Sequence, residues 1–362
     1  MSFSINIAAD VVASTIERFN DPKDPKEILQ HCANKPLLRK LLEKKSEFAA
    51  AGAASGTTAP PNFREPVQGQ LMRDKPSFYS GIAGADVLTF TSGDGAIQTT
   101  CPVRWMHAGW QITHDELMYQ GVVISNNNRD VVPSKDDQVK LFDALQLRKA
   151  DYQESIAYAR NNTLWQDGSQ DAKAIAGIKS ILTDDPTVGT VLGISRSNTW
   201  WRHVADTGVG GAGQKLSFSK SDQTMTERLN KVINVILPLY GGMPDTALAG
   251  SDLIDGLIKE MRAKGQITVE GWTDPYTDLS VTGVQFGRLK IEFDPTLDLI
   301  GEAKSIYIWD SNKLKLRPQK GQWGKVTVQN QPADQFVMLT STTDRGTLTC
   351  NQMDCNYKGV MA

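Results

Sequence analysis

A tract of small residues near the start of the chain most constrains its fold. Residues 49–61, AAAGAASGTTAPP, contain only Ala, Gly, Ser, Thr and Pro. These side chains cannot pack a hydrophobic core, so the tract is predicted to be a flexible link. The whole chain has 362 residues, which exceeds the roughly 250 to 300 at which one core stops growing. We therefore expect two compact units, or one unit with long extensions.

The residues before this tract are predicted to form an extension that contains two short helices. Apolar residues recur at helical spacing in residues 6–19 and again in Pro36–Leu42, where Pro occupies a favourable first-turn position. Each helix has an apolar stripe and little to bury it against locally. Two interpretations remain open: a disordered tail, or an arm that becomes ordered along a neighbouring chain.

Composition excludes several classes of protein. The 39 basic and 41 acidic residues give a net charge of −2, with no long block of like charge, which argues against a dedicated nucleic-acid binder. No apolar run of about 18 residues or signal peptide is present, so we expect no membrane span and a cytoplasmic site of synthesis. The cysteines are few and fit reduced thiols, and Cys350 and Cys355 lack the second ligand pair of a zinc site.

From Phe63 to Val132 the pattern alternates with period two, which predicts strands. Val87–Thr91 and Val103–His107 alternate in this way, and Ser92–Gly95 carries a turn signal between them. The sequence thus predicts a long hairpin. It has too few apolar positions for a core of its own, so we expect it to lie against another chain.

Good helix formers run without Gly or Pro from Lys135 to about Asn161, behind the N-cap candidate Ser134. This helix would be about 40 Å long. The segment Gly177–Arg202 follows, with many turn residues, a tryptophan pair and no catalytic grouping. We interpret that segment as one that serves packing and assembly.

A compact α/β region is predicted after residue 222. Thr224 and Glu227 form a capping box for a helix that Pro238 closes, and a second helix covers Ser251–Lys264. Strands are predicted at Ile267–Glu270, Val281–Phe286, Leu289–Phe293, Ile306–Trp309, Leu314–Leu316, Lys325–Val328, Gln335–Thr340 and Thr347–Cys350. Residues 310–313 are expected to join two of these strands as a hairpin loop. The fold class is α+β.

The sequence offers no enzyme motif with the flanking elements that such a motif needs. Gly208–Gly213 satisfies G-x-G-x-x-G, but neither an apolar strand before it nor a helix after it is predicted. No phosphate-binding P-loop and no G-x-S-x-G elbow occurs. His107 and His114, with Asp115, would approach a metal only if the strands folded back, so we expect no catalytic residue, no cofactor and no metal.

The turn-rich segment carries a resemblance to a known family. Leu192–Arg196 followed by Trp200–Arg202 resembles a loop in the major capsid proteins of tailed double-stranded DNA bacteriophages, which have the HK97-like fold. Lys35–Lys45 and Arg64–Val67 look like the N-terminal arm of that family. The order of arm, hairpin, long helix, loop, α/β region and terminal strands is similar over nearly the whole chain.

This resemblance implies an HK97-like capsid fold in five parts. They are an N-terminal arm (1–66), an extended E-loop (67–125), a P-domain with a spine helix (126–221), an A-domain (222–325) and C-terminal strands that return to the P-domain (326–362). The implied function is a non-catalytic shell subunit that self-assembles around viral double-stranded DNA. The alternatives are an encapsulin-like nanocompartment shell and, less favoured, a soluble α/β enzyme.

The implied partners are copies of the chain in pentamers and hexamers, a separate scaffolding protein, a portal protein, a possible cement protein and packaged DNA bound non-specifically, with no membrane. The virion capsid is the expected location, after assembly in the host cytoplasm. No lysine lies between Lys75 and Lys135, so the isopeptide crosslink that some relatives form from an E-loop lysine is expected to be absent. The interface candidates are Pro36, Leu37, Leu38, Trp105, Trp110, Arg129, Arg196, Trp200, Trp201 and Arg202.

Overall fold

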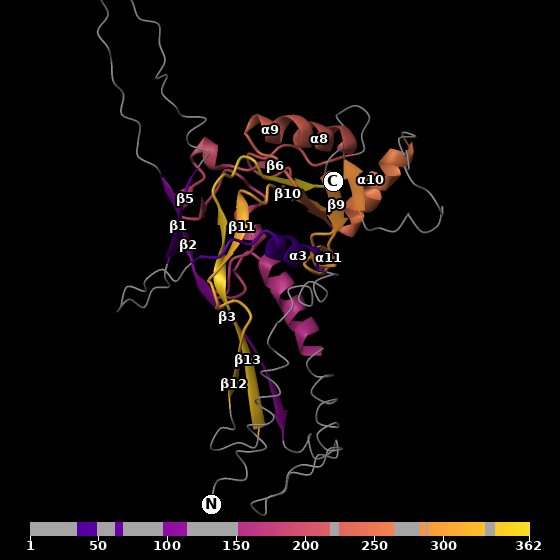
Figure 1. Ribbon diagram of the computed structural model, residues 1–362. Helices are drawn as coiled ribbons and strands as arrows, with labels where there is room; N and C mark the ends of the chain where they lie inside the picture. Colours follow the sequence, from indigo (N-terminus) through magenta and orange to yellow (C-terminus); the bar gives the residue numbers. More distant parts are fainter. Residues whose placement is uncertain are drawn as a thin grey trace, which may run out of the picture.

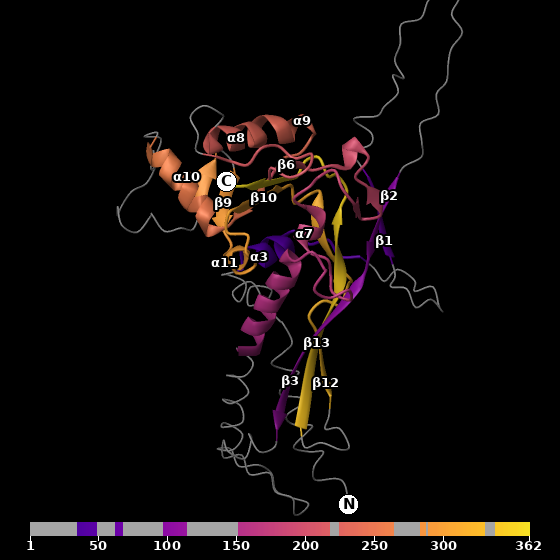
Figure 2. The same cartoon turned by 180° about the vertical axis from the view of Figure 1, so that it is seen from behind.

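The computed structural model describes residues 35–48, 62–67, 97–113, 151–217, 224–263, 283–286, 289–329 and 337–362. These residues form a body of helices and sheet, from which a β-ribbon and a helix extend side by side (Figures 1 and 2). The predicted mixture of helix and sheet is confirmed. The predicted helix at 6–19, the strand at 87–91 and the start of the long helix lie outside the described residues.

The body is built on a six-stranded mixed sheet in the order β6-β14-β10-β7-β9-β8. The β6/β14 and β7/β9 pairs are parallel, and the others are antiparallel. The central strands are buried on both faces, which explains their almost continuous apolar sequence. The strands are β6 (Val204–Asp206), β7 (Thr246–Ala249), β8 (Gly283–Phe286), β9 (Leu289–Phe293), β10 (Ser305–Trp309) and β14 (Tyr357–Val360).

One face of this sheet is covered by α8 (Met225–Lys231), a π-helical turn η2 (Val232–Ile236), α9 (Leu237–Leu239) and α10 (Ser251–Ala263). The predicted capping box between Thr224 and Glu227 is confirmed. The π turn stands immediately before α9, which contains Pro238. Since proline has no N–H and its ring would clash with the preceding turn, a widened turn accommodates it.

The opposite face is covered by α3 (Pro36–Glu43), the end of a helix over residues 151–165, α7 (Ile178–Ile181) and α11 (Pro295–Leu299). Leu37 and Leu38 are fully buried there. The stripe of Pro36–Leu42 is therefore buried within its own chain, which neither of the two interpretations, a disordered tail or an arm along a neighbouring chain, anticipated. Its partners come from segments more than a hundred residues away, which local periodicity does not reveal.

A second sheet continues into the ribbon. Its central strand β13 (Val337–Cys350) pairs with β11 (Leu314–Pro318), β12 (Lys325–Gln329) and β3 (Arg104–Thr113). We predicted two short strands, Gln335–Thr340 and Thr347–Cys350, where β13 runs unbroken. The strand β3 pairs with β13 over ten residues of each strand, a partner within its own chain that we did not predict, while contact of the hairpin with another chain stays a prediction.

The loop at 310–313 does not form the predicted hairpin. Both edges of β10 are occupied, by β14 and β7, so β11 turns away and joins the second sheet. The first sheet also includes β6 and β14, which lie outside the range 222–325 predicted for the A-domain. Two small antiparallel pairs complete the fold: β1 (Asn62–Pro66) with β2 (Gln98–Pro102), and β4 (Thr190–Val191) with β5 (Ile194–Ser195).

Candidate functional site

The turn-rich segment Gly177–Arg202 folds into a compact loop against β2. Its tip turns at Leu192 and Gly193, which have φ angles of 51° and 81°. Leucine rarely adopts this left-handed conformation. Here the carbonyl of Leu192 accepts a hydrogen bond of 2.8 Å from the backbone N–H of Thr100, so the tip is fixed to the strand beside it.

Arg196 holds this loop together from within. Its side chain is fully buried and donates to the carbonyls of Ile181 and Asp185 and to the hydroxyl of Thr183. Arg202 in turn donates from Nε to the carbonyl of Arg196 at 2.7 Å. Burial lowers the pKa of the Arg196 guanidinium to about 10, which still leaves it charged at neutral pH.

The two tryptophans anchor the loop to the core. Trp200 and Trp201 are 4% and 0% exposed, and their rings meet edge-on with centroids 5.8 Å apart. The indole N–H of Trp201 donates to the carbonyl of Val191 at 3.0 Å. The structure therefore supports packing against the core as the role of this pair.

A buried carboxylate joins three distant parts of the chain. Asp294 accepts hydrogen bonds from the indole of Trp165 at 2.8 Å, the backbone of Thr296 at 2.9 Å and the backbone of Leu37 at 3.4 Å. The side chain of Asn161 accepts from Leu38 N–H at 2.9 Å. Asp294 thus caps α11 and, together with Asn161, the start of α3. The sequence analysis missed this residue, although an Asp followed by Pro is a recognisable helix start.

The segments on either side of the small-residue tract are clamped together. Arg317 in β11 donates to the carboxylate of Glu65 at 2.6 Å and to the hydroxyl of Ser46 at 2.5 Å. Its guanidinium also lies 5.5 Å from the ring centroid of Phe63, which packs on Phe48. The N-terminal segment is therefore fixed to the second sheet both before and after residues 49–61.

The inner face of the ribbon packs against the helix of residues 151–165. Arg160 forms a two-pronged ion pair with Asp344, with both N–O distances at 2.7 Å. Tyr152 donates to Thr342 and packs its ring 5.8 Å from that of Trp110. Trp105 lies on the outer face of the ribbon and is 50% exposed, with the guanidinium of Arg345 at 4.7 Å from its ring.

These positions divide the interface candidates. The interior of the subunit contains Pro36, Leu37, Leu38, Arg196, Trp200 and Trp201. Trp110 and Arg202 are half-buried, Trp105 is exposed, and Arg129 lies outside the described residues. Because a buried side chain reaches a neighbour only after local opening, Trp105, Trp110 and Arg202 remain the accessible candidates. Contact of any of them with another copy stays a prediction.

The described residues show little that fits catalysis. Among them, no group of three or more metal-ligating side chains occurs. Burial raises the pKa of the Cys101 and Cys350 thiols to about 12, which makes them poor nucleophiles. The glycine-rich segment 208–213 does follow a short strand, β6, which we did not predict. It leads into residues 214–217, which are not helical, so the dinucleotide-binding arrangement is missing there.

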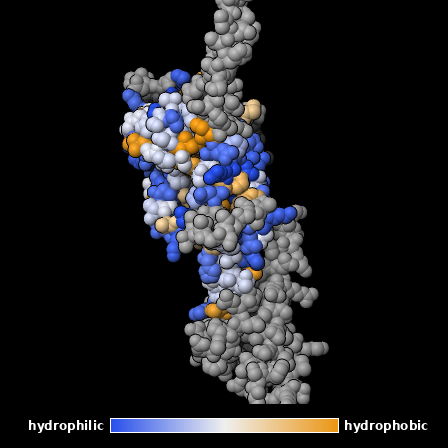
Figure 3. Space-filling model, turned by 90° about the vertical axis from the view of Figure 1, so that its left-hand side faces the viewer, coloured by the Kyte–Doolittle hydropathy of each residue, from blue (hydrophilic) through white to orange (hydrophobic). Residues whose placement is uncertain are grey.

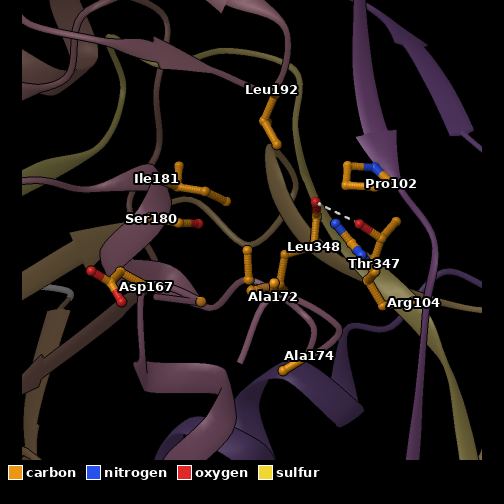
Figure 4. Close-up of a pocket in the computed structure, with 12 residues that line it drawn as sticks. Pro102, Arg104, Asp167, Ala172, Ala174, Ser180, Ile181, Leu192, Thr347 and Leu348 are labelled. Atoms are coloured by element: carbon orange, nitrogen blue, oxygen red, sulfur yellow. Dashed lines mark hydrogen bonds between the residues drawn. The ribbon is translucent and has the colours of Figure 1, made fainter. Parts of the chain in front are cut away.

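A cavity of about 120 Å³ lies between the loop and the start of the ribbon. Figure 4 shows Leu192, Ile181 and Leu348 around it, with Asp167 and Arg104 on opposite sides. Pockets for small-molecule ligands usually measure about 300 to 1,000 Å³, so this one accommodates at most a single side chain or a few waters. No helix in the described part of the chain is long and apolar enough to cross a membrane.

No protein-family model and no curated protein matches the sequence. Solved structures do match the fold. The capsid asymmetric unit of cyanophage A-1(L) aligns with a TM-score of 0.58 and 13% identity, over 90% of this chain and 92% of that chain. This chain has the fold of a phage capsid subunit.

Two further structures agree with this assignment. The capsid of an empty GTA particle aligns with a TM-score of 0.52 and 13% identity, over 89% of this chain and 96% of that one. A structure of Mycobacterium phage Bobi aligns with a TM-score of 0.50 and 10% identity, over 89% and 90%. The mixed helix-and-sheet fold of a phage capsid subunit, which the resemblance implied, is thereby confirmed over about nine-tenths of the chain. Its division into five parts stays a prediction, and the identity is too low to transfer the roles of individual residues.

Proposed function

We propose that this protein is the major capsid protein of a tailed double-stranded DNA bacteriophage and forms the icosahedral shell from pentamers and hexamers. The observation that carries the proposal is the match to the cyanophage capsid subunit, which spans nine-tenths of both chains. The role is structural and needs no catalytic group.

Contacts between copies are proposed to use the outer face of the ribbon. Trp105 is half-exposed there beside Arg345, and Trp and Arg are the residues most enriched in the energetically dominant parts of interfaces. Arg202 is a second accessible candidate at the end of the turn-rich loop. The E-loop of residues 67–125 would supply further contacts, and because it has no lysine beyond Lys75, the isopeptide crosslink from an E-loop lysine is expected to be absent.

The proposed partners follow from this role. A separate scaffolding protein would guide assembly, a portal protein would join the shell, and a cement protein would reinforce it. The almost balanced charge of the chain suits a wall that encloses DNA without binding it tightly. The protein would then reside in the virion capsid after assembly in the host cytoplasm.

Negative-stain microscopy and sedimentation velocity of the purified protein test the proposal, with and without the proteins encoded beside it. Large closed shells, or tubes and sheets of the same lattice, would support it. Small cages that retain a cargo enzyme would favour the encapsulin-like alternative. A protein that stays monomeric under all these conditions would refute a shell function.

A further inference from the structure

The tip of the turn-rich loop has a backbone conformation that one of its residues does not favour. Strands β4 and β5 are joined by Leu192 and Gly193, and both have positive φ angles, 51° and 81°. A two-residue hairpin turn of this kind favours Asn, Asp or Gly, because other side chains strain the left-handed conformation. Leu192 is the one non-glycine residue with positive φ in the described part of the chain. The turn is therefore strained.

Contacts with β2 keep this strained turn in place. The carbonyl of Leu192 accepts the hydrogen bond of 2.8 Å from the backbone N–H of Thr100. Gly193 lies so close to the strand that a Cβ added there would be 3.2 Å from the Cβ of Thr100. Among the described residues, the bond from Thr100 is the one backbone hydrogen bond that joins the β1–β2 pair to the rest of the chain.

The base of the same hairpin is held independently of β2. The backbone N–H of Arg196 donates to the carbonyl of Gly189 at 3.0 Å, and the indole of Trp201 donates to the carbonyl of Val191 at 3.0 Å. Neither bond involves Thr100 or any other residue of β2. The tip can therefore move away from β2 while the base stays fixed to the core.

The cavity of about 120 Å³ beside the loop leaves room for this movement. Leu192 forms one part of its wall, with Leu348 and Pro102 on other sides (Figure 4). A side chain that borders a void lacks part of its packing contacts, so little attraction is lost when it moves.

The β1–β2 pair lies at the outer edge of the body in Figures 1 and 2. The side of the molecule that carries β1 to β3 shows only small hydrophobic patches among hydrophilic surface (Figure 3). Asn62, Arg64 and Gln98 of the pair are exposed. The outward side of the pair is therefore suited to water, and its polar attachments to the body are the loop tip and the ion pair of Arg317 with Glu65.

We propose that the Leu192–Gly193 turn is a latch, which holds β2 in a strained closed position and releases it when the turn relaxes. Closing provides a hydrogen bond and opening relieves the strain, so the two positions have similar free energies. Opening frees the N–H of Thr100 while the base of the hairpin and the core stay folded. This inference concerns the single subunit and does not depend on the proposed function.

Native-state hydrogen exchange of the unassembled, full-length subunit tests the latch without any variant. The amide of Thr100 should exchange at least about tenfold faster than the amides of β10. Low concentrations of urea should change its rate little, because a local opening exposes little surface. Exchange of Thr100 at the rate of β10, with the same dependence on urea, would show that the tip opens only when the whole subunit unfolds, and the inference would fail.

A matched pair of variants isolates the contribution of the strain. Leu192→Asn and Leu192→Ala both remove the apolar side chain, but Asn tolerates a positive φ better than Ala does. The amide of Thr100 should therefore exchange about threefold more slowly in the Asn variant than in the Ala variant. Val188→Asn and Val188→Ala are the control and should exchange alike, because Val188 is 67% exposed in the same loop and has no positive φ. Equal rates in the two Leu192 variants, or the same difference between the two Val188 variants, would overturn the inference.

Discussion

Asp294 offers the sharpest perturbation of this fold, because its carboxylate is fully buried and serves two helix starts and an indole. Asp294→Ala removes the acceptor of the hydrogen bonds from the indole N–H of Trp165 and the backbone N–H of Thr296. Each stranded buried donor costs about 1 to 3 kcal/mol, and the lost cap of α11 contributes to the same total. We expect the free energy of unfolding to fall by about 4 kcal/mol. Asp294→Asn keeps one acceptor and should lose about half of that.

Urea unfolding of the unassembled subunit, followed by tryptophan fluorescence, measures this loss. With a slope of about 3 kcal/mol/M, the Asp294→Ala midpoint should shift by more than about 1 M. Asp255→Asn, an exposed carboxylate on α10, is the matched control and should stay within about 0.5 kcal/mol. In a double-mutant cycle, Trp165→Phe should cost less in the Asp294→Asn background than alone. A loss below about 1 kcal/mol for Asp294→Ala would refute the argument.

Three further outcomes are expected. Burial lowers the pKa of His203 from 6.5 to about 3, so the unfolded chain binds a proton at a higher pH than the folded chain does. The free energy of unfolding is therefore retained above about pH 6.5 and falls by about 3 kcal/mol by pH 4. In urea titrations, His203→Gln should reduce this loss of stability at acid pH. Arg160→Lys loses the two-pronged pair with Asp344, so hydrogen exchange in the ribbon should accelerate about tenfold while that of α10 stays unchanged. In a Cys32→Ser background, iodoacetamide at pH 8 should label no thiol until urea is added, and rapid native labelling would contradict the burial of Cys101, Cys350 and Cys355.

Local patterns in the sequence identified elements whose signals lie within a few residues. The capping box at Thr224 and the strand at Leu289–Phe293 appear as predicted. Predictions failed where the deciding partner was far away in the chain. The segment of β13 was predicted as two short strands, yet β3 and β12 pair with its middle from both sides and it continues as one strand. Residues 310–313 looked like a hairpin loop, yet the neighbours of β10 leave no free edge.

The candidate interface residues show the same limit. Residue type marked Trp200, Trp201 and Arg196 as important, but type alone does not separate a core anchor from a surface contact. Accessibility decided that question, and it placed these three inside the subunit while leaving Trp105 exposed.

Helix starts, strand periodicity and the order of elements follow from the chain alone, because each depends on interactions between residues close in sequence. The burial of α3, the continuous β13 and the choice between core and surface for each tryptophan depend on contacts that form only when distant segments meet. Leu37 illustrates the difference: its sequence neighbours mark a helix, and only Asp294, 257 residues later, provides the acceptor for its backbone N–H.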